Sequence, residues 1–313
     1  MTPARKNDHT IPILVTGAHR SGTTWVGKML AADPNTAFIS EPLNVLHRPG
    51  VFRAPVGHWY TYITAENEDR YLPAFRELLN FQYHFWREFI SLRSPRDFLR
   101  MGRDFHIFYR GSIEGQRALI KDPFALFSAP WFAQRLNCKV VITVRHPAGF
   151  ASSLKRLGWH YDFRNLLDQP LLMRDHLEAD RTAMQSMPQD DIIGQGALLW
   201  KLIYRFVDSI RNRFPQFYIV RHEDLSRDPI GGFQSLYRSL GLDFTEPVKE
   251  TIRNSSSSEN PKKLAKRKTH SVKLDSRANL DNWKKLLSPE EVDRIRKLTE
   301  GVSDRFYSEE EWR

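Results

Sequence analysis

Residues 17–25 of this 313-residue sequence have the composition of an anion-binding turn. The stretch Gly17-Ala-His-Arg-Ser-Gly-Thr-Thr-Trp25 combines two glycines, three hydroxyl side chains and the cation Arg20. An apolar, β-branched stretch at 11–16 precedes it and predicts a buried strand, and the helix-forming stretch 26–32 follows it. The first N–H groups of a helix lack partners inside the helix, and the helix dipole favours negative charge there. Strand, turn and helix together therefore predict a cradle for an anion.

The glycine spacing is similar to that of a Walker A loop but departs from it at one position. Gly17 and Gly22 stand where G-x-x-x-x-G-K-S/T has its glycines, yet Thr23 stands where the lysine should be. The cation comes earlier, at Arg20. A nucleotide kinase or NTPase needs that lysine and an acid that holds Mg²⁺, so this alternative is disfavoured. An ordinary turn between strand and helix is also disfavoured, because the segment is rich in groups that donate hydrogen bonds to anions.

A second candidate anion site follows the most apolar predicted strand, Lys139–Val144. Its near-continuous apolar run is typical of a central parallel strand that is covered on both faces. Arg145 ends this strand, Pro147 opens a helix, and Ser153 follows Arg145 by eight residues. Eight residues are a little over two helical turns, so Arg145 and Ser153 can border the same anion. The alternative is an arginine that only forms a salt bridge at the strand end.

Charged side chains also follow two other predicted strands. Glu41 comes after a strand at 36–39, and Lys121 and Asp122 come after a later one. Because open α/β sheets bind ligands at the carboxyl ends of their strands, we expect all three side chains to face the crevice of the first anion site. Pro42 follows Glu41 and favours an extended conformation for it. A solvated turn carboxylate, and a Lys–Asp pair that only fixes its turn, are the alternatives.

In this order, the two anion motifs and the Glu-Pro sequence resemble those of the PAPS-dependent sulfotransferase family, where PAPS is 3′-phosphoadenosine 5′-phosphosulfate. The likeness is to its soluble, bacterial-type and carbohydrate-sulfotransferase-like members. It implies a three-layer α/β fold, with a central, mainly parallel sheet, helices on both faces and a relation to P-loop NTPases. It also implies an O-sulfotransferase that moves the sulfuryl group of PAPS to an acceptor hydroxyl, with a saccharide as the expected acceptor, and releases PAP.

The resemblance implies catalytic roles for five residues. Glu41 is the expected base that accepts the hydroxyl proton, Asp122 is a second candidate, and His146 ranks behind both. Arg20 or Lys121 is expected to stabilise the negative charge on the departing phosphate oxygen.

The resemblance also implies a set of nucleotide-binding residues. Segment 17–24 would hold the 5′-phosphosulfate, and Trp25 would stack on adenine. Arg277 would help to bind the 3′-phosphate, although the usual Arg-Lys-Gly triplet is absent around it. The full set is Gly17, His19, Arg20, Ser21, Gly22, Thr23, Thr24, Trp25, Arg145, Ser153 and Arg277.

The formal net charge of +10 fits an anionic ligand, a nucleic acid or a membrane surface, and the alternative is charge that only aids solubility. A nucleic acid would fit this charge, but no recognised nucleic-acid-binding motif is present, so we expect no nucleic-acid partner. A non-catalytic relative that only binds PAP is a further alternative. The histidines are scattered rather than spaced as metal ligands, so we expect no metal. No motif identifies the acceptor or the oligomeric state.

The sequence also bears on cellular location. No apolar run approaches the roughly 20 residues that span a bilayer, and segment 1–10 is polar, without the apolar core of a signal peptide. Cys138 is the single cysteine and cannot form an intrachain disulfide, which suits a reducing compartment. We therefore expect a cytoplasmic enzyme without a membrane span.

We expect one sulfotransferase domain over residues 1–313. Helical insertions are expected at about 43–115 and 157–195, where acceptor specificity would lie, and a flexible basic loop at about 254–275. An aromatic-rich helix predicted from Pro73 to Leu92 is either a packing layer or an acceptor-binding lid. In the late sequence Arg221-His-Glu-Asp-Leu225, the two acids are expected to be turn and cap residues.

Overall fold

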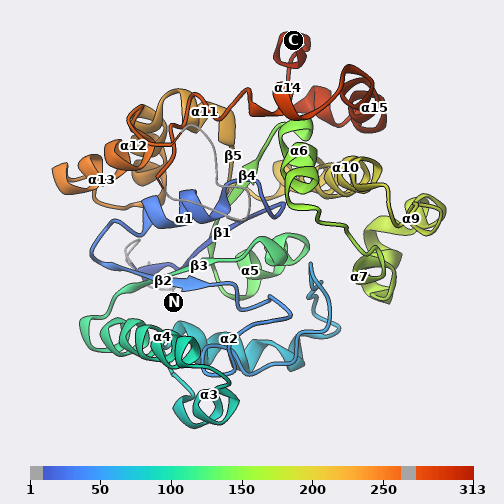
Figure 1. Ribbon diagram of the computed structural model, residues 1–313. Coiled ribbons are helices and arrows are strands. Elements are labelled where there is room, and N and C mark those ends of the chain that lie inside the picture. The colour runs from blue at the N-terminus through green and yellow to red at the C-terminus, as the bar shows by residue number, and fades with distance from the viewer. Residues whose placement is uncertain (1–9, 262–272) are drawn as a thin grey trace.

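The computed structural model describes residues 10–261 and 273–313. Within those ranges a five-stranded sheet with the order β2-β3-β1-β4-β5 forms the centre of the molecule (Figure 1). The strands are β1 (Ile13–Gly17), β2 (Thr36–Ser40), β3 (Arg117–Lys121), β4 (Lys139–Val144) and β5 (Phe217–Arg221).

All four strand pairs are parallel, so the carboxyl ends of the strands meet at one edge of the sheet. The register pairs Gly17 with Thr143 and Ser40 with Lys121. The segments that follow β1, β2, β3 and β4 therefore begin side by side. These are the segments on which the sequence places its candidate site residues.

Successive side chains of β1 belong to two different hydrophobic cores. Leu14 packs with Ile120 and Ile142 on one face of the sheet, and Ile13 and Val15 pack on the other. All five side chains are fully buried. A strand that is buried on both faces requires an unbroken apolar run, which explains the composition of β1 and β4.

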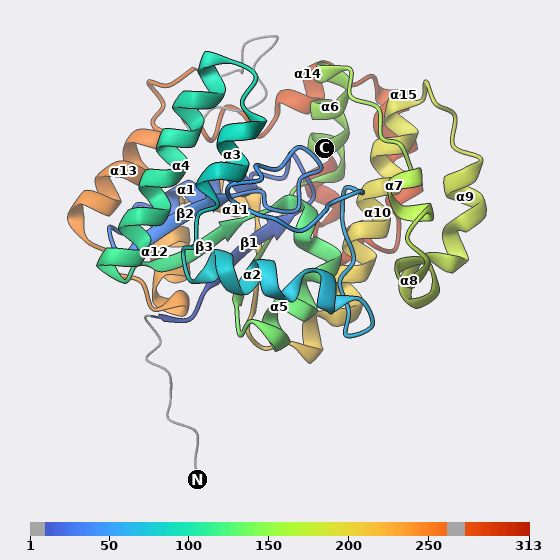
Figure 2. The same cartoon turned by 90° about the horizontal axis from the view of Figure 1, so that it is seen from below.

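Helices cover both faces of the sheet, which confirms the three-layer α/β architecture. Figure 2 shows α2 and α5 in front of the sheet. The first core contains side chains of α2 (Leu72–Leu79), α5 (Ala129–Arg135) and α10 (Ile192–Ile210). The second core contains side chains of α1 (Thr23–Leu30), α12 (Pro229–Leu240) and α13 (Glu246–Ser256). The remaining α-helices are α3 (Phe85–Ser91), α4 (Pro95–Glu114), α6 (Pro147–Leu157), α7 (Arg164–Leu167), α8 (Pro170–Leu172), α9 (Arg181–Gln185), α11 (His222–Arg227), α14 (Asn282–Leu286) and α15 (Pro289–Thr299).

The single helix expected from Pro73 to Leu92 is wrong. The chain forms α2 and α3 instead, and Phe81 between them has a φ of 53°. This turn brings the Phe81 ring against α4. A Cβ added to Gly111 would lie 2.5 Å from the Phe81 ring, and the ring centroids of Phe81 and Phe108 are 6.1 Å apart. Tertiary packing therefore overrides the local helical pattern.

Serine, a strongly preferred N-cap residue, begins two other helices. The Ser94 side chain caps α4 by accepting a hydrogen bond from the Asp97 amide at 3.3 Å. Ser288 and Glu291 form a capping box at the start of α15. Of the basic loop expected at about 254–275, residues 262–272 lie outside the described ranges.

Candidate active site

The first anion motif connects the end of β1 to the start of α1. Three residues of this turn have left-handed or related backbone angles, with φ of 148° at Gly17, 69° at Arg20 and 94° at Gly22. Gly22 is the N-cap of α1, and no side chain caps the helix or places an acid in its first turn. The amides at the start of α1 therefore have the environment that binds an anion.

Close packing explains the two glycines of the turn. A Cβ at Gly17 would lie 2.5 Å from the carbonyl oxygen of Thr143, and one at Gly22 would lie 2.7 Å from Nδ1 of His222. The Ser21 hydroxyl donates to the carbonyl oxygen of Ala18 at 2.5 Å and lies 2.6 Å from Oγ1 of Thr143. Ser21 is fully buried, so its side chain closes the turn against β4.

His19 supports the turn through Tyr60. Its Nδ1 lies 2.7 Å from the Tyr60 hydroxyl oxygen, and its backbone amide donates to the same oxygen at 3.0 Å. The ring also contacts Trp59, Phe150 and Tyr161. Burial, followed by the neighbouring charge of Arg20, lowers the pKa of His19 to about 3, so the ring is neutral at pH 7.

The two anion motifs meet at Arg20. Its Nε donates to the hydroxyl of Ser153 at 3.1 Å, and Nη1 of Arg145 donates to the carbonyl oxygen of Arg20 at 2.9 Å. Burial, and then the charges of Arg145 and Arg156, lower the pKa of Arg20 to about 10. In the described part of the chain, neither Arg20 nor Arg145 forms an ion pair with a carboxylate. Glu223 is close enough to act on the charge of Arg145 but makes no ion pair with it in the described ranges. Positive charge that is gathered without a direct ion pair suits an anionic ligand.

A buried carboxyl group holds the second motif in place. Oε1 of Glu223 accepts a hydrogen bond from the His146 amide at 2.9 Å, and Oε2 accepts one from the Tyr307 hydroxyl at 2.9 Å. Burial raises the pKa of Glu223. The expectation that Glu223 is only a turn or cap residue misses this role, although its place after β5, the neighbour of β4, was a usable signal.

His146 has the environment of a packing residue. Its ring stacks on Trp283 with 5.3 Å between ring centroids and meets Trp312 edge-on at 4.4 Å. Burial is the main cause that lowers its pKa to about 3. Both ring nitrogens are buried and have no hydrogen-bond partner among the residues that the structure describes. This geometry disfavours His146 as a base.

Trp25 and Arg277 lie on the surface side of this region. Nε1 of Trp25 donates to the Ser255 hydroxyl at 3.0 Å, and the indole is partly exposed. Arg277 donates from Nε and Nη2 to the carbonyl oxygen of Arg227 at 3.1 and 2.8 Å. Among its described contacts neither Arg145 nor Ser153 occurs. A role for Arg277 at the 3′-phosphate stays a prediction.

Glu41 and Lys121 form an ion pair across the ends of β2 and β3. Oε1 of Glu41 accepts from Nζ of Lys121, and Oε2 accepts from Nδ2 of Asn44 at 2.7 Å. The Glu41 amide also donates to the Lys121 carbonyl oxygen at 2.8 Å. Lys121 is buried, whereas 30% of the Glu41 side chain is exposed, so the carboxylate is the member that a ligand can reach.

The expected extended conformation of Glu41 is wrong, because its φ is 53°. A non-glycine residue rarely adopts this left-handed region, and strain of this kind is concentrated at functional sites. The hydrogen bond from the Glu41 amide to Lys121, and the hydrogen bonds from the side chains of Lys121 and Asn44 to the carboxylate, fix this conformation despite the preference that Pro42 imposes.

Asp122 is more deeply placed than Glu41. Its two oxygens accept from the amides of Leu43, at 2.5 Å, and Phe124, at 2.9 Å. Burial, and then the nearby charge of Glu41, raise the pKa of Asp122 to about 7. The side chain is fully buried and ties the segment after Glu41 to β3. Its role as a second base stays a prediction, and the geometry favours Glu41.

A pocket of about 590 Å³ opens beside this ion pair, and we call it the Glu41 pocket. It extends from Thr24, near the start of α1, to Glu41 and Lys121. Its other walls combine cationic and apolar side chains from α1, from the segment that follows β2, and from α4. These include Lys28, Arg48, Arg100, Arg103, Ile107 and Phe108. Through Thr24, the pocket therefore connects the first anion motif to the candidate base.

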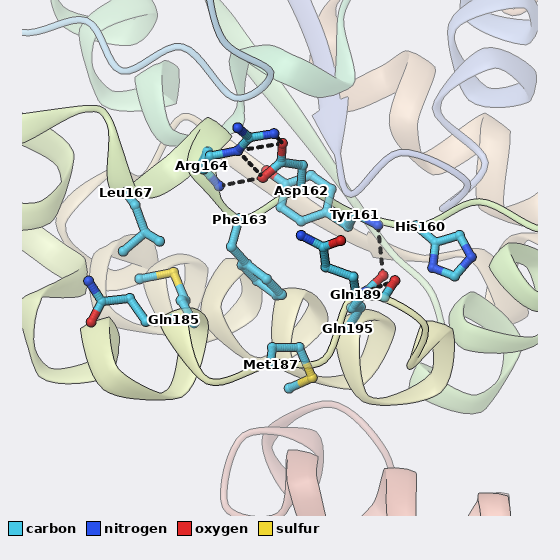
Figure 3. A pocket seen from close by; sticks show the side chains of 11 residues that line it. His160, Tyr161, Asp162, Phe163, Arg164, Leu167, Gln185, Met187, Gln189 and Gln195 are labelled. Atoms are coloured by element: carbon cyan, nitrogen blue, oxygen red, sulfur yellow. Dashed lines mark hydrogen bonds and ion pairs between the residues drawn. The ribbon is translucent and has the colours of Figure 1, made fainter.

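A second pocket, of about 620 Å³, lies in the insertion at 157–195, and we call it the Met187 pocket (Figure 3). Figure 3 shows Arg164 held by Asp162, and their ion-pair distance is 2.6 Å. The Tyr161 amide donates to the side-chain oxygen of Gln195 at 2.9 Å. None of the candidate site residues lines this pocket, so the Glu41 pocket is the better candidate for the acceptor.

Two further observations concern the described ranges alone. No group of three or more His, Cys, Asp or Glu side chains there could hold a metal ion. None of the helices there has the length and apolar character that crossing a membrane requires.

Comparisons with known proteins identify the family of this chain. Carbohydrate sulfotransferase 1 of Danio rerio is 29% identical over 189 residues, which are 60% of this chain and only 40% of that protein. The sulfotransferase domain of the Synechococcus PCC 7002 olefin synthase has a TM-score of 0.46 and 18% identity, with 98% of both chains covered. A mouse sulfotransferase complexed with PAP has a TM-score of 0.45 and 13% identity, covering 98% of this chain and 88% of its own. The family model described as "Sulfotransferase family" matches residues 12–246, and the chain therefore belongs to the sulfotransferase family.

Proposed function

We propose that this chain transfers the sulfuryl group of PAPS to a hydroxyl group of an acceptor and releases PAP. The observation that carries the proposal is the meeting of the two anion motifs at Arg20, next to a pocket that contains Glu41 and Lys121. Membership of the sulfotransferase family supports the same reaction.

The residues fit a nucleotide that carries an anion at both ends. The amides at the start of α1, with Thr23 and Thr24, would donate to the 5′-phosphosulfate. Arg145 and Ser153 would bind the 3′-phosphate, which ATP and AMP lack. Trp25, a partly exposed residue of α1, would stack on adenine. The observation that supports this fit is that Arg20 and Arg145 lie together and that neither forms an ion pair with a carboxylate in the described ranges.

The contacts of His19 and Ser21 suggest supporting roles rather than ligand contacts. The Ser21 hydroxyl and the His19 ring are both buried and both engaged by neighbouring side chains. They would hold the turn in the shape that presents its amides.

The chemical step would be an in-line displacement at sulfur. The acceptor oxygen forms a bond to sulfur while the bond between sulfur and the 5′-phosphate oxygen breaks, and that oxygen keeps the electron pair. Glu41 would accept the hydroxyl proton. Arg20 or Lys121 would stabilise the charge that grows on the departing oxygen, and preorganised donors of this kind contribute roughly 3–4 kcal/mol each.

The walls of the Glu41 pocket indicate the class of acceptor. Lys28 brings positive charge within reach of a substrate that is already anionic, and Arg100 and Arg103 add hydrogen-bond donors there although Asp97 and Asp104 pair with them. The carbohydrate sulfotransferase among the relatives favours a saccharide. We therefore propose a hydroxyl-bearing, anionic saccharide as the acceptor.

The proposal includes a cytoplasmic location, which rests on the cysteine content. Cys138 is the single cysteine of the sequence and is buried. A protein without disulfide bonds suits a reducing compartment.

Turnover with radiolabelled PAPS across a panel of neutral and anionic saccharides tests the reaction. We expect label transfer by the wild type, and a kcat lower by about 10²–10⁴-fold for Glu41→Gln, because the variant lacks the base. PAP affinity should stay within about twofold of the wild type, since Glu41 lies outside the nucleotide site. Asp122→Asn is the matched control for the second carboxyl group.

Three outcomes separate the alternatives. A Glu41→Gln variant as active as the wild type would remove Glu41 as the base. A loss of turnover in Asp122→Asn alone would transfer that role to Asp122. Tight PAP binding without transfer to any acceptor would favour the non-catalytic PAP-binding relative.

A further inference from the structure

A large apolar surface lies on α3 and α4, outside the candidate site. Trp86 is 72% exposed, Ile90 82% and Leu99 73%, which is unusual for side chains of this size. We call this surface the α3–α4 face. Its members are Phe85, Trp86, Phe89 and Ile90 on α3, and Phe98, Leu99, Phe105, Tyr109 and Ile113 on α4. In Figure 1, α3 is the outermost element on its side of the molecule.

The α3–α4 face is continuous rather than a set of scattered residues. The rings of Phe85 and Phe105 connect the two helices, with centroids 5.9 Å apart. Phe105 stacks on Tyr109 at 6.0 Å, and Phe89 lies 6.3 Å from Phe85 and 6.1 Å from Trp86. A contiguous apolar surface of this kind marks an interaction site.

The sequence of α4 places exposed apolar side chains and buried side chains on two different stripes of the helix. Phe98, Phe105, Tyr109 and Ile113 follow one another at intervals of seven, four and four residues, so they form one exposed stripe. A second stripe turns toward the protein. It contains the buried residues Met101, Asp104, Phe108 and Gly111.

Exposed arginines border the apolar stripe. Six exposed arginines lie on α3, on α4 or between them, namely Arg87, Arg93, Arg96, Arg100, Arg103 and Arg110. Three of these arginines pair with acids of the same segment. Arg100 lies 3.7 Å from Asp97, Arg103 lies 2.7 Å from Asp104, and Arg110 lies 2.6 Å from Glu114. The α3–α4 face is therefore apolar at its centre, and within the described ranges its positive charge without an ion pair lies at Arg87, Arg93 and Arg96.

We propose that the α3–α4 face binds the surface of an anionic lipid bilayer. Aromatic and aliphatic side chains beside a row of arginines are the composition of a helix that lies in a membrane interface. The arginines complement the negative charge of anionic headgroups. A second copy of the chain is the weaker candidate, because a twofold interface would set one row of arginines against the other.

The location of α4 connects this surface to the Glu41 pocket. Arg100 and Arg103 lie among the exposed arginines and also line that pocket. A bilayer bound to the face would lie beside the pocket and would present hydroxyl groups of lipid-anchored acceptors to it. Vesicle binding itself needs no turnover, so its test is independent of the proposed reaction.

Flotation of the full-length protein with vesicles tests the proposal. Two vesicle compositions are needed, phosphatidylcholine alone and phosphatidylcholine mixed with phosphatidylglycerol. We expect the wild type to float with the anionic vesicles only. The triple variant Trp86→Ala, Phe89→Ala, Ile90→Ala should bind them at least about tenfold more weakly, because it loses apolar contact with the acyl region.

A charge-reversal variant tests the contribution of the arginines to vesicle binding. Arg93→Glu with Arg96→Glu should weaken binding at least about twentyfold, since each basic residue near an anionic surface contributes about fivefold. Arg238→Glu with Lys297→Glu makes the same charge change on exposed positions of α12 and α15 and should bind within about twofold of the wild type. Unchanged melting temperatures and PAP affinities would show that all variants are folded.

Three results would overturn the proposal. The first is a wild type that floats with neither kind of vesicle. The second is an equal loss of binding in the control and in the face variants, which would mean that overall charge is responsible. The third is a wild-type dimer in solution that the triple variant converts to a monomer, which would assign the face to a second copy of the chain.

Discussion

The nucleotide side of the candidate site and the α3–α4 face lie in one molecule but are held by different means. On the nucleotide side, small and polar side chains such as Ser21 and Ser153 are buried, and the backbone of Gly17 and Gly22 leaves no room for a side chain. On the α3–α4 face, large apolar side chains are exposed, and a Cβ at Gly102 would meet no atom within 4 Å. Larger side chains should therefore be tolerated poorly in the first region, whereas the second can accept them without loss of the fold.

Gly17→Ala should have the largest effect on stability and on PAP binding, and so tests how closely the nucleotide side is packed. The new methyl group would lie 2.5 Å from the Thr143 carbonyl oxygen, at a φ of 148° that side chains disfavour. We expect the free energy of unfolding to fall by roughly 2–5 kcal/mol and PAP binding to be lost. Denaturant titration and calorimetry measure both effects. Gly57→Ala, where a Cβ has nothing within 4 Å, is the control, and an equal loss there would contradict the account.

Acid sensitivity should differ between the two regions. Burial lowers the pKa of His146 from 6.5 to about 3, so between these values the unfolded chain binds a proton that the folded chain does not. Stability is therefore fully present above about pH 6.5 and is lost as the pH falls, by ~1.4 kcal/mol per pH unit for this residue. His146→Asn should remove that part of the slope in melting curves. A His146→Asn variant that keeps the wild-type slope would refute the assignment.

Arginines of α4 should affect acceptor binding without affecting the nucleotide. Arg100 and Arg103 line the Glu41 pocket, whereas the nucleotide would lie at Arg20 and Arg145. For Arg100→Ser with Arg103→Ser we expect KM for an anionic acceptor to rise about tenfold at unchanged PAP affinity. Steady-state kinetics with the acceptor found in the radiolabel screen measures this. A neutral acceptor that is affected equally would remove the electrostatic explanation.

Gly102→Ala should have the smallest effect, and in the opposite direction to Gly17→Ala. Gly102 lies in the exposed interior of α4, and alanine favours the helix over glycine. We expect a gain of about 0.5–1 kcal/mol in the free energy of unfolding and no change in PAP binding. A destabilised variant would mean that the exposed surface of α4 is more closely packed than its contacts indicate.

Sequence alone predicts the sheet and several helix boundaries because those signals are local. The apolar run of β4 and the serine caps of α4 and α15 each identify an element from adjacent residues. The predicted single helix over 73–92 is wrong because the packing of Phe81 against Gly111 is a long-range contact.

The candidate site shows the same limit. Arg145 and Ser153 are recognisable by their spacing, but the contact of Ser153 with Arg20 depends on the neighbouring positions of β1 and β4. The left-handed Glu41 contradicts a correct local rule because Lys121 and Asn44 hold it. The buried support from Glu223 depends on strand order, which no single motif encodes.

Calorimetric titration of PAP, AMP and ATP into the wild type and Arg145→Ala, without metal, tests the central claim most directly. We predict that the wild type binds PAP at about micromolar affinity or tighter and binds AMP and ATP much more weakly. Arg145→Ala should lower PAP affinity roughly 10- to 100-fold, to the level of AMP, because it removes a charged partner of the 3′-phosphate. If Arg145→Ala binds PAP as the wild type does, the two-ended anion site is contradicted. If ATP binds more tightly than PAP in a parallel titration with Mg²⁺, the sulfotransferase account is contradicted and the kinase alternative gains support.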